Sequence, residues 1–121
     1  MNYDNNNIFA KIIRAEIPCK KIYEDDFVLS FYDINPQKKI HALVIPKGKY
    51  IDLDDFNTNA SNEEIIGLMK GITTVAKKLG ISSIDGKGYR ALANISDYGG
   101  QEVPHLHFHL FGGEKVGKMV S

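Results

Sequence analysis

Apolar residues spaced three or four positions apart predict a long helix in the second half of the chain. They trace one helical face at Ile65, Leu68, Met69, Ile72, Val75, Ala76 and Leu79. This spacing is typical of a helix that packs one face on a core. Ser61 and Glu64 match the capping box that begins a helix, and Gly80 is a common helix stop.

Five shorter apolar runs predict strands. They cover residues 21–23, 27–32, 40–45, 89–94 and 104–112. A short helix precedes them, because apolar residues recur at helical spacing after Asn7 and the pattern stops at Pro18. Short connections favour a mostly antiparallel sheet. The pattern therefore predicts an α+β fold, with two helices packed against one face of a five-stranded sheet.

Composition narrows the possible partners. The chain has 121 residues, enough for one domain with a core, and its 15 Lys and Arg residues balance 15 Asp and Glu residues. This balance gives no general attraction to nucleic acid or to a membrane, so any anion must be bound locally. The single Cys19 excludes an internal disulfide. No secretory signal and no apolar run of ~20 residues is present, so we expect a cytoplasmic protein.

Three of the four histidines alternate within one apolar run. They are His105, His107 and His109, and the residues between and after them are Leu106, Phe108 and Leu110. Successive side chains of a strand point to opposite faces, so we expect the imidazoles on one face and the apolar residues on the core. Adjacent rings would then start ~6.6 Å apart and the outer pair ~13 Å apart. This row suits a phosphate ester better than a single zinc ion, which needs its ligands at ~2.0 Å.

Imidazole chemistry fits such a ligand. An unperturbed imidazole titrates near pH ~6.5, so at neutral pH one histidine can act as a nucleophile while another donates a proton. His41 begins the third predicted strand, and we expect it to support the other histidines through hydrogen bonds. The glycines at positions 99 and 100 can turn backbone amides toward an anion, and Asn94 adds an amide donor.

These segments together resemble a known family. The run from Asn94 through the three histidines to Gly112 resembles the signature of the histidine triad (HIT) superfamily. Residues 8–18, 23–26, 33–37 and 41–47 resemble the branch of histidine triad nucleotide-binding proteins. We therefore expect a HIT domain at residues 8–113, a disordered N-terminal tail at residues 1–7 and a C-terminal tail at residues 114–121.

The resemblance implies a fold and a reaction. It implies the HIT-like fold and a homodimer whose sheet continues across the interface. The implied substrate is a purine nucleotide, related to AMP or GMP, whose phosphorus is bonded to nitrogen. Hydrolysis of that bond would release a nucleoside monophosphate and an amine, without a metal or another cofactor.

The resemblance also implies roles for individual residues. His107 would be the nucleophile, the backbone carbonyl of His105 would orient its ring, and His109 would bind a phosphate oxygen. Asp33 would bind the ribose hydroxyls, with Ile34 beside the nucleoside. The implied purine slot consists of Ile8, Phe9, Ile12, Phe31 and Leu43. The implied phosphate and leaving-group side consists of Asn94, Gly100, Gln101 and Glu102. Val103 is a further implied substrate-binding residue.

Other interpretations of these residues remain open. Without the resemblance, Ile12 and Leu43 would be assigned to core packing, and Asp33 to a turn before Asn35 and Pro36. Glu102 departs from the pattern, because relatives often have a small hydroxyl residue there. Its carboxylate would either weaken phosphate binding or favour a cationic amine, such as a lysine, as leaving group, and we expect the second.

Two alternative functions also remain open. Two adjacent triad histidines with His41 could form the zinc site of a zinc- or nucleotide-binding regulatory module that has no significant turnover. Dinucleoside polyphosphate hydrolysis, the activity of a sister branch, is the other alternative.

Overall fold

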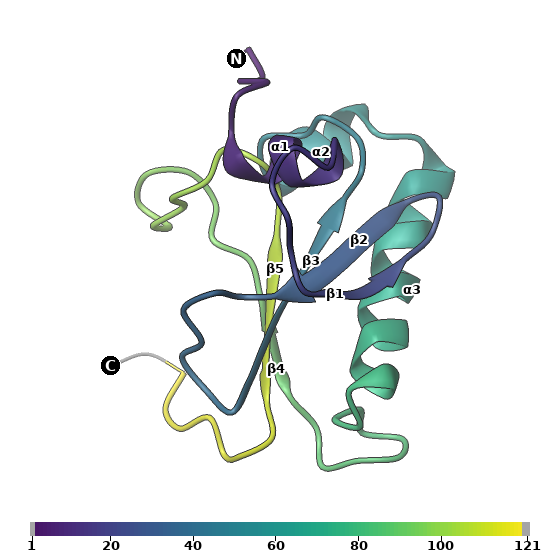
Figure 1. Ribbon diagram of the computed structural model, residues 1–121, viewed down its shortest axis with the longest axis vertical. Helices are drawn as coiled ribbons and strands as arrows, with labels where there is room; N and C mark the ends of the chain where they lie inside the picture. Colours follow the sequence, from purple (N-terminus) through teal and green to yellow (C-terminus); the bar gives the residue numbers. More distant parts are fainter. Residues whose placement is uncertain (1, 120–121) are drawn as a thin grey trace.

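A five-stranded antiparallel sheet forms the centre of the protein (Figure 1). The computed structural model describes residues 2–119. Its elements are α1 (Ile8–Ile13), β1 (Lys21–Glu24), β2 (Val28–Tyr32), β3 (Ile40–Pro46), α2 (Leu53–Asn59), α3 (Asn62–Lys78), β4 (Arg90–Leu92) and β5 (Phe108–Gly112). The strands lie in the order β1-β2-β3-β5-β4. The predicted α+β fold with an antiparallel sheet is confirmed.

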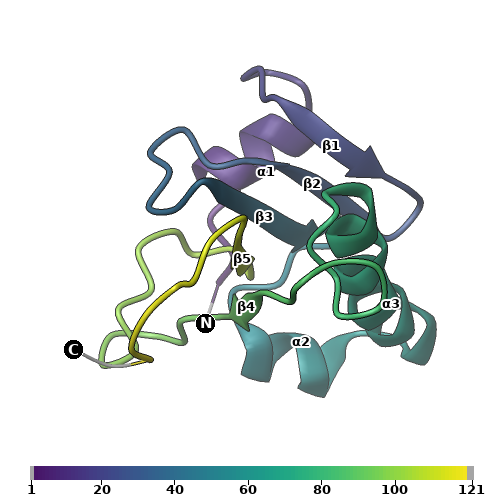
Figure 2. The same cartoon turned by 90° about the horizontal axis from the view of Figure 1, so that it is seen from below.

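Helices cover both faces of the sheet, so the prediction that they share one face is wrong. Leu29 and Leu43 belong to a core cluster with Phe9 of α1, whereas Val28 and Val44 pack in a second cluster with residues of α3. Figure 2 shows α1 and α3 on opposite sides of β2 and β3. Both strands are apolar at consecutive positions, and consecutive side chains point to opposite faces. Each face therefore needs a cover.

The long helix begins and ends as the sequence predicts. The Ser61 hydroxyl accepts a hydrogen bond from the Glu64 backbone at 3.1 Å, and the Glu64 carboxylate accepts one from the Ser61 backbone at 3.1 Å. Together they satisfy two N–H groups that the first turn leaves free. At the other end Gly80 has φ +72°, a conformation that is favourable only without a side chain.

A third helix, α2, was not predicted. The Asp52 carboxylate caps it by accepting a hydrogen bond from the Asp55 backbone at 2.8 Å. Phe56 is its one buried residue. A seven-residue helix with a single buried side chain has no apolar repeat, so its sequence resembles a polar loop.

The last two strands are shorter than predicted by several residues each. β4 has three residues, and β5 starts only at Phe108, so His105, which lies in a bend, and His107 both precede it. Leu106 and Leu110 are nevertheless buried in the cluster under α3, as their alternation predicted. Among residues 2–119, no helix is both long and apolar enough to cross a membrane.

The N-terminal residues expected to be a disordered tail make specific contacts. The Asn7 side chain accepts a hydrogen bond from the Ala10 backbone at 2.9 Å and thereby caps α1. The same side chain donates to the Asp4 carbonyl at 2.7 Å. Asn7 is buried, and the chain before it folds back onto the domain, where Tyr3 contacts His105. Residues 3–7 therefore make hydrogen bonds within the structure.

Candidate active site

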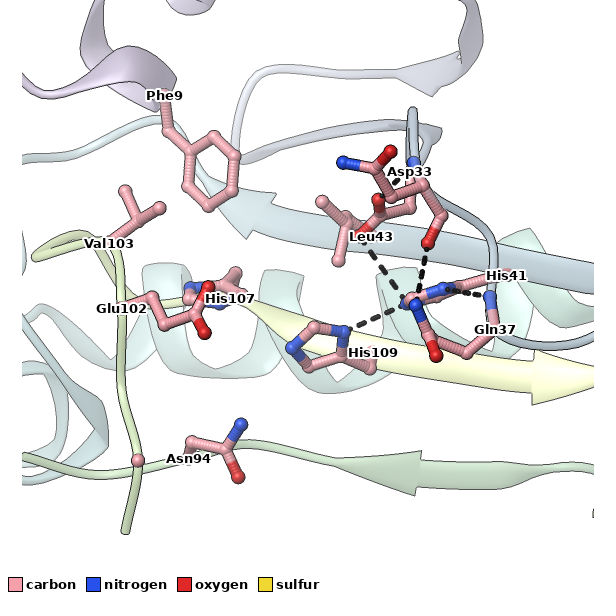
Figure 3. A pocket seen from close by; sticks show the side chains of 12 residues that line it. Phe9, Asp33, Gln37, His41, Leu43, Asn94, Glu102, Val103, His107 and His109 are labelled. Atoms are coloured by element: carbon pink, nitrogen blue, oxygen red, sulfur yellow. Dashed lines mark hydrogen bonds and ion pairs between the residues drawn. The ribbon is translucent and has the colours of Figure 1, made fainter. Parts of the chain in front are cut away.

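A pocket of ≈ 270 Å³ lies on the sheet face that α1 covers (Figure 3). The pocket is lined by Phe9, Asp33, Asn35, Gln37, His41, Leu43, Asn94, Gly100, Glu102, Val103, His107 and His109. Residues from the first helix, two loops and two strands thus meet at one place. Their order in the sequence does not show this proximity.

Strand register places the polar residues of the pocket on one face. Leu43 of β3 lies opposite His109 of β5, which in turn lies opposite Leu92 of β4. Side chains two positions apart on a strand share a face. His41 therefore lies beside Leu43, and Asn94 follows Leu92 on the same side.

The His107 ring is held by the backbone. Its Nδ1 lies 2.8 Å from the carbonyl oxygen of His105. A carbonyl only accepts hydrogen bonds, so Nδ1 carries the proton and Nε2 keeps its lone pair. The edge of Phe9 packs against the ring, with centroids 4.9 Å apart. The pocket therefore contains an oriented imidazole with an unprotonated nitrogen.

His109 has the opposite tautomer. The backbone N–H of Gln37 donates to His41 Nδ1 at 3.1 Å, so the proton of neutral His41 is on Nε2. That nitrogen lies 2.9 Å from Nδ1 of His109, as Figure 3 shows. His41 therefore donates and His109 Nδ1 accepts, which leaves the proton of His109 on Nε2. His109 is a hydrogen-bond donor at its free nitrogen, whereas His107 is an acceptor there.

His105 does not face the pocket, which differs from the expected row of three rings. Its side chain is fully buried, with Nε2 2.8 Å from the Pro46 carbonyl and Nδ1 2.5 Å from the Tyr3 hydroxyl. The chain bends at residues 103–105 and is not yet a strand there. The strand rule that predicted three aligned rings therefore applies only from His107 onward. The His107 and His109 ring centroids are 5.0 Å apart.

Burial keeps all four imidazoles neutral at pH 7. Loss of hydration lowers the pKa of His105 to about 4 and that of His109 to about 4, and neighbouring histidines reinforce both shifts. Burial also lowers the pKa of His107 and His41, while the nearby Asp33 carboxylate opposes the change. Desolvation disfavours the charged form of an imidazole. The tautomers assigned above therefore hold at neutral pH.

The structure brings seven of the twelve proposed substrate residues to the pocket. They are Phe9, Asp33, Leu43, Asn94, Gly100, Glu102 and Val103. Phe31 and Ile12 instead pack in the core cluster around Phe9. Ile8 and Ile34 are 41% and 85% exposed and lie outside the pocket lining.

The Gln101 side chain and the Gly100 amide form hydrogen bonds that stabilise the loop between β4 and β5. The Gln101 side chain donates to the carbonyls of Ile51 and Val103 at 2.6 and 3.0 Å, so its amide nitrogen holds the loop against the domain. The Gly100 N–H donates to the Asp97 carbonyl at 3.0 Å. Neither group is directed at an anion in the pocket, contrary to the expectation for a glycine-lined phosphate site.

Asn35 and Gln37 line the pocket but were not predicted as site residues. They belong to the loop that connects β2 to β3. The Asn35 N–H donates to Asp33 Oδ1 at 2.8 Å, the turn contact that an aspartate before Asn-Pro suggests. The turn signal was present in the sequence, but nothing showed that the turn folds over His41.

Three side chains of the pocket also form a potential metal site. One ligand atom from each of Asp33, His41 and His109 lies within 4.8 Å of the other two. Carboxylate oxygen and imidazole nitrogen are common zinc ligands. This set differs from the expected one, because it replaces a second triad histidine with an aspartate.

Comparison with known proteins agrees with this geometry. The HIT domain family model matches residues 14–116. A purine nucleoside phosphoramidase of Escherichia coli is 43% identical over 114 residues, covering 94% of this chain and 92% of that protein. An uncharacterized HIT-like protein of Azospirillum brasilense is 50% identical over 119 residues, covering 98% and 95%.

Solved structures agree as well. A HIT family hydrolase from Clostridium thermocellum superposes with a TM-score of 0.85 at 37% identity, covering 98% of this chain and 99% of that one. A histidine triad protein from Clostridium difficile superposes with a TM-score of 0.81 at 38% identity, covering 98% of both chains. With its fold, its histidine pocket and these relatives in agreement, the chain belongs to the HIT domain family.

Proposed function

We propose that this protein hydrolyses the phosphorus–nitrogen bond of purine nucleoside phosphoramidates. The observation that carries the proposal is the pair of opposite tautomers at His107 and His109, whose ring centroids lie 5.0 Å apart. One ring offers a lone pair and the other offers an N–H group. A nucleophile and an anion-binding donor are what displacement at phosphorus needs.

In the proposed reaction His107 Nε2 attacks the phosphorus in line with the bond to nitrogen. That bond breaks, the amine departs after protonation, and the nucleotidyl group remains on the imidazole. The His105 carbonyl accepts the Nδ1–H and stabilises the positive charge on the ring. His109 Nε2–H donates to a phosphate oxygen. Water then attacks the phosphorus, releases the nucleoside monophosphate and regenerates His107.

The remaining pocket residues suit a nucleoside. Phe9, Leu43 and Val103 provide apolar surface for a purine, and the Asp33 carboxylate provides acceptors for ribose hydroxyls. Both Asp33 oxygens keep acceptor capacity, because Oδ1 accepts one N–H from Asn35 and Oδ2 lies 3.5 Å from His41 Nε2. The name of the Escherichia coli relative, purine nucleoside phosphoramidase, supports the same substrate class.

The test is turnover of adenosine 5′-phosphoramidate. Wild type should release AMP, and His107→Ala should lose nearly all activity while keeping the unfolding midpoint of a folded protein. Diadenosine polyphosphates in the same assay test the dinucleotide alternative. Equal turnover by wild type and His107→Ala would exclude His107 as nucleophile.

A regulatory metal-binding module is the second candidate, favoured by the cluster of Asp33, His41 and His109. Metal analysis of protein purified without added zinc separates the two functions. A stoichiometric ion removed by chelator, together with no turnover before or after removal, supports the module. Turnover by metal-free protein supports the hydrolase.

We also propose the homodimer that the resemblance implies. Within residues 2–119, β4 is an edge strand, since β5 is its single pairing partner. An exposed strand edge is a site where a second copy can extend a sheet. Sedimentation should give twice the 13.5 kDa chain mass, and a proline at Ala91 should shift the protein toward monomer.

A further inference from the structure

The Tyr3 side chain reaches a histidine that is 102 positions away in sequence. Its hydroxyl lies 2.5 Å from Nδ1 of His105, and the two rings meet edge to face with centroids 5.6 Å apart. His105 is fully buried and lies behind the pocket, outside its lining. Tyr3 therefore contacts the segment that carries His107 at a residue outside the pocket lining.

The direction of this hydrogen bond follows from the other end of the ring. His105 Nε2 lies 2.8 Å from the Pro46 carbonyl, which accepts only, so Nε2 carries the proton. Burial lowers the pKa of His105 to about 4, so the ring is neutral and Nδ1 has a lone pair. The Tyr3 hydroxyl must then donate to Nδ1. The ring is thus fixed at both nitrogens, between Tyr3 and the end of β3.

The fixed ring determines where the His105 backbone lies. The carbonyl of His105 accepts the Nδ1–H of His107 at 2.8 Å, and this contact selects the tautomer and orientation of His107. A shift of the His105 side chain moves the backbone that holds His107. Tyr3 is therefore linked to His107 through one residue and two hydrogen bonds.

Residues near Tyr3 hold it in place. The Asp4 carbonyl accepts from the Asn7 side chain at 2.7 Å and from the Asn7 backbone at 3.2 Å, which closes a turn directly after Tyr3. Arg14 donates to the Asn5 carbonyl at 2.8 Å and ties this turn to the end of α1. The segment is thus anchored to the helix that also supplies Phe9 to the pocket.

We propose that Tyr3 is a positioning residue for the nucleophile: its hydroxyl fixes the His105 ring and thereby the tautomer and orientation of His107. The inference rests on the proposed function for its kinetic consequence. Its structural part concerns only the coupling of Tyr3 to the two histidines. Tyr3 touches no substrate in this account and acts through His105 alone.

The test compares Tyr3→Phe with Tyr23→Phe. Both variants keep the ring and lose one hydroxyl hydrogen bond, but Tyr23 lies on β1 and bonds Asp25 at 2.8 Å, remote from the pocket lining. The net value of such a bond corresponds to a change of roughly two- to tenfold in rate. Tyr3→Phe should lower kcat on adenosine 5′-phosphoramidate by that amount with KM unchanged, and Tyr23→Phe should leave both unchanged.

Nitrogen-15 spectra of the histidines supply a measurement that needs no substrate. In wild type, His105 should be protonated on Nε2 with Nδ1 as acceptor, and His107 protonated on Nδ1. Tyr3→Phe should shift the His105 Nδ1 resonance and give a detectable population of the His107 tautomer that is protonated on Nε2. Tyr23→Phe should leave both histidine spectra as in wild type.

Three outcomes overturn the inference. They are a proton on Nδ1 of His105 in wild type, histidine spectra of Tyr3→Phe identical to wild type, and an activity loss that only follows loss of folded protein. Absence of any phosphoramidate turnover by wild type would instead overturn the proposed function. The spectra would still decide whether Tyr3 sets the state of His107, so the two failures are distinguishable.

Discussion

His41 Nε2 lies 2.9 Å from His109 Nδ1, and this contact decides which nitrogen of His109 is the hydrogen-bond donor in the pocket. The loop after β2 sets the contact, because its Gln37 N–H occupies the other nitrogen of His41. The loop between β2 and β3, which is far from the triad in sequence, therefore controls the tautomer of His109 through His41.

Replacement of His41 should impair catalysis without removing the nucleophile. His41→Ala leaves His109 Nδ1 without a donor, so His109 can take up the other tautomer and turn a lone pair toward the phosphate. We expect kcat to fall about tenfold, the value of one hydrogen bond of ~1.4 kcal/mol. Steady-state kinetics of phosphoramidate turnover measures this effect.

His41→Gln is the matched control, since its side-chain amide keeps an N–H donor. It should retain more activity than His41→Ala. Wild-type kcat in His41→Ala would contradict the tautomer assignment of His109.

The buried His105 should make stability depend on pH. Its pKa is about 4 in the folded protein and near ~6.5 when unfolded, so the unfolded chain binds the extra proton between these values. Stability is then fully present above pH ~6.5 and is lost as pH falls toward 4. From pH 7 to pH 5, His105 alone should lower the unfolding free energy by about 2 kcal/mol.

Urea unfolding at a series of pH values between 7 and 5 measures this change together with losses of the same sign from His109, His107 and His41, whose pKa values burial also lowers. Carboxylates contribute little in that window, because their unfolded pKa values are near ~4. An unfolding free energy that stays constant from pH 7 to pH 5 would show that His105 is not buried in its neutral form.

Glu102 should bias the enzyme toward cationic leaving groups. Its side chain lies at the pocket beside His107 in Figure 3 and is exposed, so its charge acts through partly screened attraction. Glu102→Gln should lower the ratio of lysyl to uncharged-amide turnover about two- to fivefold. Competition between two nucleoside phosphoramidates that differ only in the amine measures the ratio.

Glu63→Gln on α3 changes the same charge away from this pocket and should leave the ratio at its wild-type value. A ratio that is equal in Glu102→Gln and wild type would remove Glu102 from leaving-group selection.

The spacing of apolar residues along the sequence predicted the long helix and the strands, because each has several apolar residues packed in the core. α3 follows from its repeat and its capping box, and the sheet follows from five alternating or apolar runs. α2 was not predicted because its single buried residue, Phe56, cannot form an apolar repeat. Helices lie on both faces of the sheet because β3 has apolar residues at consecutive positions, which point to opposite faces. The apolar run alone did not show which elements would cover each face.

The sequence predicted the part of the site in which histidines recur at every second position, the spacing of a strand. His107, directly before β5, and His109 within it both line the pocket, whereas His105 lies in the bend at residues 103–105 and faces Tyr3. Contacts between distant segments, such as Tyr3 with His105, leave no local signal. The Asp33 turn was predicted from its neighbours, whereas its position over His41 required the fold.

The most direct test of the central claim is to locate the covalent intermediate. Wild-type protein mixed with adenosine 5′-phosphoramidate and quenched during the first turnover should contain an adenylyl group, and peptide mass analysis should place it on His107. His107→Ala treated in the same way should carry none. An adenylyl group on a different residue, or full turnover by His107→Ala, would contradict the account.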